Sequence, residues 1–234
     1  MTVLAFIPAR GGSKRLPGKN LALVGGCPLV GRAVVSASYC DRVVISTDSE
    51  EVWQAARPSL TAFATIGVHE RHERPAPLAS DSAQIEDALA HWWTRAAEKP
   101  DVVVLLQPTS PLRTAQHVRE AVQLLRDTDA DSVVSVTLGH EHHFAGRLKP
   151  RDDLGGAMEW SPFRDVLAER PRTQDLRPVG AENGAIYVFT RRHWERTSNR
   201  LGGRMVAYPM DRWHSIDVDT EEDLRVARLL AEGL

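Results

Sequence analysis

Residues 3–20, VLAFIPARGGSKRLPGKN, join a continuous apolar run to a tight loop rich in positive charge. The run at residues 3–7 is typical of a strand buried on both faces of a parallel sheet, because polar residues do not alternate with the apolar ones. Gly11 and Gly12 allow a sharp turn that brings backbone N–H groups close to an anion. We therefore expect a polyphosphate to bind at the carboxyl end of this strand. The loop supplies the cations Arg10, Lys14, Arg15 and Lys19.

Similar runs recur along the chain and predict the fold class. Strand patterns occur at residues 42–47, 101–107, 131–136, 183–189 and 204–210. Helical patterns occur at residues 28–38, 82–97 and 114–127 and after residue 220. Possible N-caps of helices are Asp48, Asp81 and Thr220. Because strands and helices alternate, the sequence predicts right-handed βαβ units and an α/β fold with a doubly wound, mostly parallel sheet.

The length and composition predict one globular domain. The chain has 234 residues, of which 42 % are hydrophobic and 26 % charged, so it can bury a proper core. We expect a single domain over residues 1–234. Residues 137–182 break the pattern, because proline, glycine and charge are scattered there without a clear period. Such a long irregular stretch inside a compact domain predicts a functional or inserted segment, which we place at about residues 137–182.

Charge and cysteine content argue against several classes of function. The formal net charge of −2 gives no basic excess, so we expect neither a nucleic acid nor a membrane as partner. Cys27 and Cys40 have no CxxC spacing and predict neither a disulfide framework nor a zinc site. No apolar run has the length of a membrane-spanning helix, and no signal-peptide core is recognisable. We expect a cytoplasmic protein.

The charged loop differs from the common phosphate-binding motifs. GSKRLPGKN misses the P-loop pattern GxxxxGK[ST] twice, since five residues separate Gly12 from Gly18 and Asn20 stands in place of the magnesium-binding hydroxyl. Walker-type ATPase chemistry is therefore disfavoured, and the lack of GxGxxG disfavours a dinucleotide site. A solvated basic loop without a ligand stays open as the alternative.

Residues 7–20, IPARGGSKRLPGKN, resemble the signature of the acylneuraminate cytidylyltransferase (CMP-sialic acid synthetase) family. Further segments resemble that family in the same order along nearly the whole chain: VVISTDSEEV, RPAPLASDSA, LLQPTSPLR, NGAIYVF and SIDVDTEEDL. The resemblance implies a Rossmann-like nucleotidyltransferase fold in which the inserted segment is a dimerisation arm, so we expect a homodimer. It also implies an enzyme that transfers CMP from CTP to the anomeric hydroxyl of a nonulosonic (sialic-acid-like) acid and releases pyrophosphate.

The resemblance implies which residues bind the nucleotide. Arg10 and Lys19 hold the triphosphate and act in catalysis, because nucleotidyl transfer places developing charge on the phosphate oxygens. Other members of the site are loop residues that cradle or pair with the phosphates and two residues near cytosine. They are Gly11, Gly12, Ser13, Lys14, Arg15, Asn20, Arg74 and Ala83.

The segment SIDVD contains the candidate metal ligands Asp217 and Asp219. Their i, i+2 spacing points both side chains to one side of an extended segment. Mg²⁺ prefers hard oxygen ligands and needs only one or two carboxylates beside its waters. Solvated acids in front of a helix are the alternative interpretation. The resemblance favours a Mg²⁺ site, with Asp219 also counted among the catalytic residues.

The acceptor side follows the family less closely. Gln107 ends a buried strand, where a polar group needs partners, and the resemblance assigns it to the acceptor sugar. Arg172 and Gln174 are further candidate acceptor residues, with Arg172 one position before the place of the family's arginine. Residues that stand where the family places cationic or aromatic acceptor contacts are Gly146, Thr173, Gly180 and Ala181. We therefore hypothesise that Arg172, with Arg147 or Lys149, binds the carboxylate of the acceptor.

Two alternatives to activation of a sialic acid follow from these departures. The acceptor can be another acid, such as a 3-deoxy-octulosonate-like sugar or a phosphonate, or the chain can be a non-catalytic nucleotide-binding regulator. The intact cations and carboxylates of the nucleotide site argue against the regulator. The histidines of HEHH lie in the irregular stretch and are more typical of solvated side chains than of metal ligands; they are His140, His142 and His143.

Overall fold

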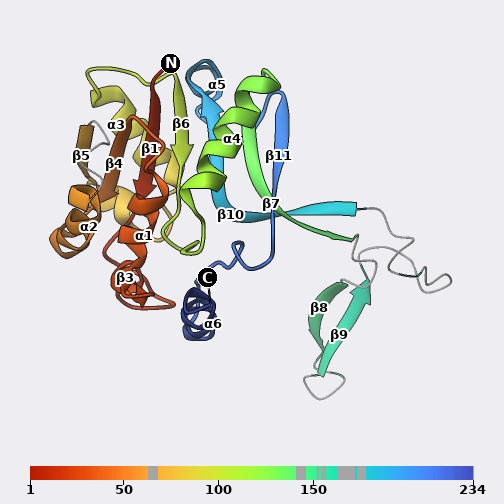
Figure 1. Ribbon diagram of the computed structural model, residues 1–234. Coiled ribbons are helices and arrows are strands. Elements are labelled where there is room, and N and C mark those ends of the chain that lie inside the picture. The colour runs from red at the N-terminus through yellow and green to blue at the C-terminus, as the bar shows by residue number, and fades with distance from the viewer. Residues whose placement is uncertain are drawn as a thin grey trace. The chain divides into compact units, whose positions relative to one another are not determined.

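The computed structural model describes residues 1–62, 68–140, 146–151, 153, 157–162, 172 and 178–233 (Figure 1). The chain divides into two compact units. The first unit contains Met1–Thr137 and Glu182–Leu234, and the second contains Leu138–Ala181. All of the predicted nucleotide and metal residues belong to the first unit.

A seven-stranded sheet forms the centre of the first unit, with the strand order β11-β7-β10-β6-β1-β4-β5. β1 pairs in parallel with both β4 and β6, whereas β10 pairs antiparallel with β6. The predicted α/β fold with a mostly parallel sheet is therefore confirmed. The strands are β1 (Val3–Pro8), β4 (Arg42–Thr47), β5 (Val68–Glu73), β6 (Val102–Leu105), β7 (Ser132–His140), β10 (Pro178–Thr190) and β11 (Met205–Met210).

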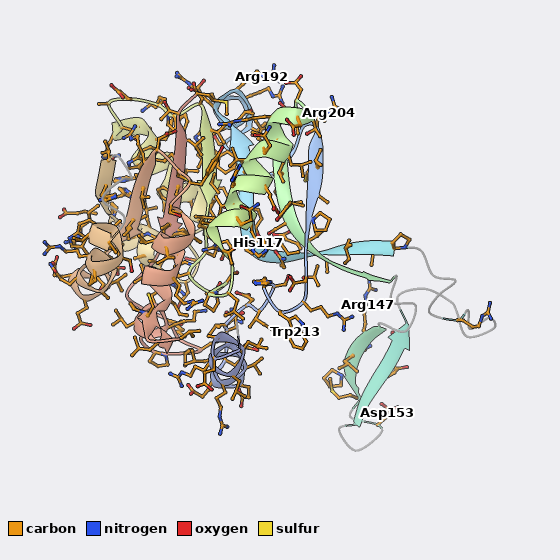
Figure 2. All side chains as sticks on the ribbon, in the orientation of Figure 1. His117, Arg147, Asp153, Arg192, Arg204 and Trp213 are labelled. Atoms are coloured by element: carbon orange, nitrogen blue, oxygen red, sulfur yellow. The ribbon has the colours of Figure 1, made fainter. Side chains whose placement is uncertain are left out.

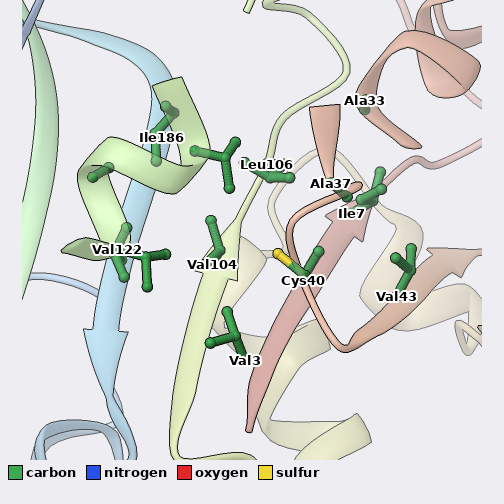
Figure 3. Close-up of a cluster of buried hydrophobic side chains, with 14 of the residues drawn as sticks. Val3, Ile7, Ala33, Ala37, Cys40, Val43, Val104, Leu106, Val122 and Ile186 are labelled. Carbon is green, nitrogen blue, oxygen red and sulfur yellow. The ribbon is translucent and has the colours of Figure 1, made fainter. Parts of the chain in front are cut away.

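Helices pack on both faces of this sheet, as alternate residues of β1 show. Val3, Ala5 and Ile7 belong to a buried cluster with side chains of three helices, part of which Figure 3 shows. Leu4 and Phe6 point to the other face and pack with Trp92 and other aromatic residues. On the first face lie α1 (Leu29–Ser36), α2 (Glu50–Ala62) and α4 (Ala115–Asp127), and on the second lie α3 (Ile85–Arg95) and α5 (Arg191–Thr197).

A third, smaller core holds the last helix, α6 (Glu221–Ala231), against the short hairpin of β2 (Leu23–Val24) and β3 (Cys27–Pro28). Thr220 caps α6 as predicted, because its side chain accepts a hydrogen bond from the Asp223 N–H. Val218 is fully buried in this core. Because adjacent side chains of an extended segment point to opposite sides, its neighbours Asp217 and Asp219 are directed away from the core.

Two predicted helix caps are wrong. Asp81 does not cap α3, which begins at Ile85 and has Gln84 as its N-cap, because two loop cations bind the Asp81 carboxylate instead. Asp48 accepts a hydrogen bond from the Gly11 N–H at 2.8 Å, and the Ser49 hydroxyl accepts the bond from Val52 N–H in the first turn of α2.

Other elements were not recognised in the sequence pattern. These are the polar edge strand β5, the short helix α5 and, in the second unit, an antiparallel hairpin of β8 (Gly146–Arg151) and β9 (Ala157–Pro162). Within the described ranges, no helix combines the length and apolar character needed to cross a membrane.

Candidate active site

The loop after β1 has the glycines that its close packing requires. A Cβ atom on Gly11 would lie 2.7 Å from the Cβ of Ser49, so a larger residue would push the loop away from α2. Gly18 has a φ of +66° and precedes the 3₁₀ helix η1 (Lys19–Leu21). Asn20 is buried, and its side-chain amide donates to the Arg10 carbonyl at 2.7 Å. Asn20 thus fixes the backbone that carries Arg10.

A cleft of about 490 Å³ opens beside this loop, at the carboxyl ends of the parallel strands. It brings together most of the predicted nucleotide residues with Gln107, although they come from distant parts of the sequence. Gly11 is the exception, because it lies behind the cleft against Asp48 and Ser49. The predicted residues that line the cleft are Arg10, Gly12, Ser13, Lys14, Arg15, Lys19, Asn20, Arg74, Ala83 and Gln107.

Two carboxylates bind the four loop cations in pairs. Asp81 forms ion pairs with Arg10 at 2.9 Å and Lys14 at 2.5 Å. Its hydrogen bond with Lys14 is the main reason why the pKa of Asp81 is lowered. Asp219 pairs in the same way with Arg15 at 2.7 Å and Lys19 at 2.9 Å. The loop cations are therefore placed to bind anionic oxygens. In this structure the oxygens are those of Asp81 and Asp219.

Arg74 reaches the cleft from a buried polar network. Its Nε and Nη2 atoms donate to the hydroxyl and the carbonyl of Ser46, each at 3.0 Å. The Ser46 hydroxyl also lies 2.9 Å from His72 Nδ1, and His72 Nε2 lies 2.8 Å from Nδ1 of His91. Burial is the main cause that lowers the pKa of Arg74 to about 10, which still leaves it charged at neutral pH. The network fixes the orientation of this guanidinium.

The two predicted metal ligands lie in different surroundings. Asp219 contacts the loop after β1 through its ion pairs, whereas Asp217 lines a neighbouring cavity of about 430 Å³. The Val218 N–H donates to the Thr109 carbonyl at 2.7 Å and holds the segment against the cleft wall. Loss of water around its carboxylate, and to a lesser extent the negative charge of Asp219, raises the pKa of Asp217, although the residue as a whole is exposed. A bound cation would offset both effects.

Gln107 lines both the cleft and the neighbouring cavity. Its side-chain amide donates to the Gly184 carbonyl at 3.2 Å. Glu182 and Asp217 give the second cavity an acidic wall, and none of its described lining residues is a lysine or an arginine. The cavity thus adjoins the cleft with the four loop cations but has the opposite charge.

Comparison with known proteins shows the family to which this chain belongs. A family model described as cytidylyltransferase matches residues 4–149. The chain belongs to the cytidylyltransferase family.

Two relatives of this chain are named N-acylneuraminate cytidylyltransferase. The chain is 32 % identical over 228 residues to the N-acylneuraminate cytidylyltransferase of Oncorhynchus mykiss, covering 96 % of this chain and 49 % of that protein. It is 31 % identical over 229 residues to the protein of the same name from Streptococcus agalactiae serotype III, covering 95 % of this chain and 52 % of that one. The chain therefore spans about half the length of these curated relatives.

Solved structures share the fold at low sequence identity. CMP:2-keto-3-deoxy-manno-octonic acid synthetase complexed with CTP aligns over 100 % of both chains with a TM-score of 0.64 and 21 % identity. The 4-diphosphocytidyl-2C-methyl-D-erythritol synthase of Anaerococcus prevotii aligns with a TM-score of 0.59 and 11 % identity, covering 99 % of this chain and 98 % of that one. At these identities the likeness concerns the fold alone.

Some acceptor residues predicted for the cytidylyltransferase lie elsewhere or outside the described ranges. Arg172 belongs to the second unit, and Gln174 and Thr173 lie outside the described residues. Sequence reasoning also missed residues that the fold brings to the cleft. Asp81 lies within the family-like segment RPAPLASDSA but was interpreted as a helix cap. Ser46 and His72 gave no signal, because the network that joins them to Arg74 depends on the pairing of β4 with β5.

Proposed function

We propose that this chain transfers CMP from CTP to the anomeric hydroxyl of a nonulosonic acid and releases pyrophosphate. The observation that carries the proposal is the pairing of all four loop cations with carboxylate oxygens at the edge of one cleft. Phosphate oxygens would take over these positions, because they bring more negative charge than one carboxylate. Membership of the cytidylyltransferase family supports the same reaction.

In this proposal, Arg10 and Lys19 stabilise the charge that develops on the α-phosphate and on the departing pyrophosphate. Lys19 suits this role because its side chain is only 13 % exposed and already faces an oxygen of Asp219. Gly12, Ser13, Lys14 and Arg15 would hold the outer phosphates. Arg74 and Ala83 would contact the cytosine, with Arg74 fixed in place by Ser46.

Asp217 and Asp219 fit a Mg²⁺ ion. They are hard oxygen ligands, and their mutual repulsion contributes to the raised pKa of Asp217. We propose that they hold the ion, which when bound would supply positive charge at the reacting phosphate. Asp219 would then exchange its contacts with Lys19 and Arg15 for the metal, and this exchange would release both cations for the triphosphate.

The acceptor is proposed to enter the cavity next to Gln107. The acidic wall formed by Glu182 and Asp217 does not suit a bare carboxylate, so that group of the acceptor needs a cation beside it. Our hypothesis for its ligands remains Arg172 with Arg147 or Lys149. This wall is the reason to keep a 3-deoxy-octulosonate-like sugar or a phosphonate as the second candidate acceptor. In this proposal the enzyme is a cytoplasmic homodimer, with residues 137–182 as its dimerisation arm.

The test is a pyrophosphate-release screen of CTP, GTP, ATP and UTP with Mg²⁺ against a panel of acidic sugars and phosphonates. We expect turnover with CTP and a nonulosonic acid, and a loss of turnover by orders of magnitude in Asp219→Asn without loss of fold. Arg172→Ala should raise the KM of the acceptor and leave CTP affinity unchanged. CTP binding without pyrophosphate release from any acid would contradict the proposal and favour a regulator.

A further inference from the structure

A cluster of two histidines and one aspartate lies in the first unit, outside the phosphate loop. Asp211 and His214 are three residues apart in the turn after β11, and His117 lies in the first turn of α4. One possible ligand atom from each of the three lies within 4.8 Å of the others, and the two imidazole centroids are 4.7 Å apart. Figure 2 labels His117 and also Trp213, which precedes His214 in the turn.

We propose that His117, Asp211 and His214 form a binding site for a divalent transition-metal ion, of which Zn²⁺ is the best match. Imidazole nitrogens are borderline ligands, so a set of two imidazoles and one carboxylate suits Zn²⁺ much better than Mg²⁺, which prefers oxygen ligands alone. This site is separate from the Mg²⁺ proposed at Asp217 and Asp219, and it does not depend on the proposed reaction. It also uses different histidines from the HEHH motif.

The turn already holds two of the three ligands in place. The Asp211 Oδ1 atom accepts hydrogen bonds from the N–H groups of Trp213 at 2.9 Å and His214 at 3.0 Å. Its Oδ2 atom lies 2.7 Å from His214 Nδ1. A metal ion would take the place of the proton shared by these two atoms, so little rearrangement of the turn is needed.

His117 completes the set from the neighbouring helix. Its Nδ1 atom accepts a long hydrogen bond of 3.2 Å from the Thr114 N–H. Coordination through the other ring nitrogen would move the proton to Nδ1 and exchange this weak bond for a metal bond. Burial and the nearby His214 lower the pKa of His117, which favours the neutral imidazole that binds metals.

An ion at this site would fix the path of the chain into the catalytic segment. The Ser215 hydroxyl donates to the Asp211 carbonyl at 2.6 Å and accepts from the Asn183 side chain at 3.0 Å. Asp217 follows two residues later. Metal binding would therefore tie the start of α4 to the turn that positions Asp217 and Asp219, and we assign the ion a structural role.

The experiment titrates chelator-treated protein with Zn²⁺ alone and with Co²⁺ alone, by calorimetry and by the visible absorption of Co²⁺. The wild type should bind one equivalent, and saturating Zn²⁺ should raise Tm by about 5 °C. His214→Ala and His117→Ala should each weaken binding by about 100-fold or more, and Asp211→Asn by about tenfold.

Two further variants serve as controls. Arg212→Ala changes an exposed neighbour in the same turn and should keep the wild-type affinity. Asp219→Asn should also keep it, which separates this site from the proposed Mg²⁺ ligands. Zn²⁺ binding that is absent, or that survives in both His117→Ala and His214→Ala, would overturn the proposal, whether or not the protein transfers CMP.

Discussion

Single residues decide whether the phosphate loop can exchange its carboxylate partners for a ligand. Asp81 and Asp219 each bind two loop cations, so an entering triphosphate gains these cations only as it displaces carboxylate oxygens. The four cations are not equivalent in this exchange. The side chain of Lys19 is 13 % exposed, whereas that of Lys14 is 84 % exposed. Because solvent screens an exposed charge, the buried lysine should contribute more to binding.

Lys19→Ala is therefore expected to weaken CTP binding by about 2 kcal/mol, since a poorly screened charge-assisted contact is lost. This corresponds to about a 30-fold rise in Kd, measured by calorimetry with Mg²⁺ present. Lys14→Ala is the matched control and should change Kd by about threefold or less. Equal effects in the two variants would contradict the difference that burial predicts.

His72 links the stability of the fold to pH. Burial, followed by the charges of His91, Arg74 and Arg95, lowers the pKa of His72 to about 4. The neutral form is favoured in the folded protein, so its contribution is complete above the unfolded pKa of about 6.5 and is lost as pH falls toward 4. We expect His72 to account for a loss of about 3 kcal/mol of unfolding free energy across this window.

Urea unfolding of wild type and His72→Gln between pH 7.5 and pH 4 measures this linkage. The variant should be less stable at pH 7.5, because the bonds to Ser46 and His91 are weakened, and its stability should fall less steeply below pH 6.5. Parallel curves for the two proteins would assign the pH dependence to other groups.

At the scale of elements, α6 determines where Asp219 lies. The Asp223 side chain accepts hydrogen bonds from the N–H groups of Asp219 at 3.0 Å and Thr220 at 2.8 Å, and Thr220 caps the helix in return. The cap and Asp219 thus belong to one hydrogen-bonded unit. A loss of the cap should therefore reduce stability and also loosen Asp219.

Thr220→Ala removes the side-chain acceptor and should reduce the unfolding free energy by about 1 kcal/mol in urea titrations. Turnover should fall severalfold because Asp219 is less well ordered. Arg225→Ala changes an exposed position in the middle of α6 and provides the control for both readouts. Unchanged turnover in Thr220→Ala would separate the helix cap from the positioning of Asp219.

The same element scale explains what the sequence could predict. The buried strands have continuous apolar runs, α4 has a clear helical period, and local residues specify the Thr220 cap, so these predictions are confirmed. β5 was missed because VHERHE forms an edge strand that keeps polar residues. The ion pairs of Asp81 could not be predicted from its helix-cap pattern, because its partners Arg10 and Lys14 lie far away in sequence. Contacts of this kind require the tertiary fold.

At the scale of the whole molecule, the second unit is inserted between β7 and β10, which are neighbours in the sheet. The Ser135 hydroxyl donates to the Asn183 side chain at 2.6 Å and accepts from the Ile186 N–H at 2.7 Å, so the two strands are joined near the insertion. These hydrogen bonds hold β7 beside β10 next to the insertion. A short loop that joined the two strands there would therefore cost little free energy to close.

Replacement of residues 138–181 by a short glycine-serine linker should give a folded protein whose CTP affinity lies within about threefold of wild type, because the cleft belongs to the first unit. Analytical ultracentrifugation should find a monomer, and acceptor turnover should be lost. A shortened chain that fails to bind CTP despite native circular dichroism would show that the nucleotide site needs the second unit.

The insertion between neighbouring strands also bears on how such enzymes change over time. A segment that leaves and re-enters the sheet at adjacent positions can be lengthened, replaced or recombined without a shift in the register of any core strand. Selection can then change the inserted segment while the loop after β1 stays under separate constraint. This arrangement agrees with a chain in which residues 7–20 resemble a family signature, whereas residues 137–182 depart from the family pattern.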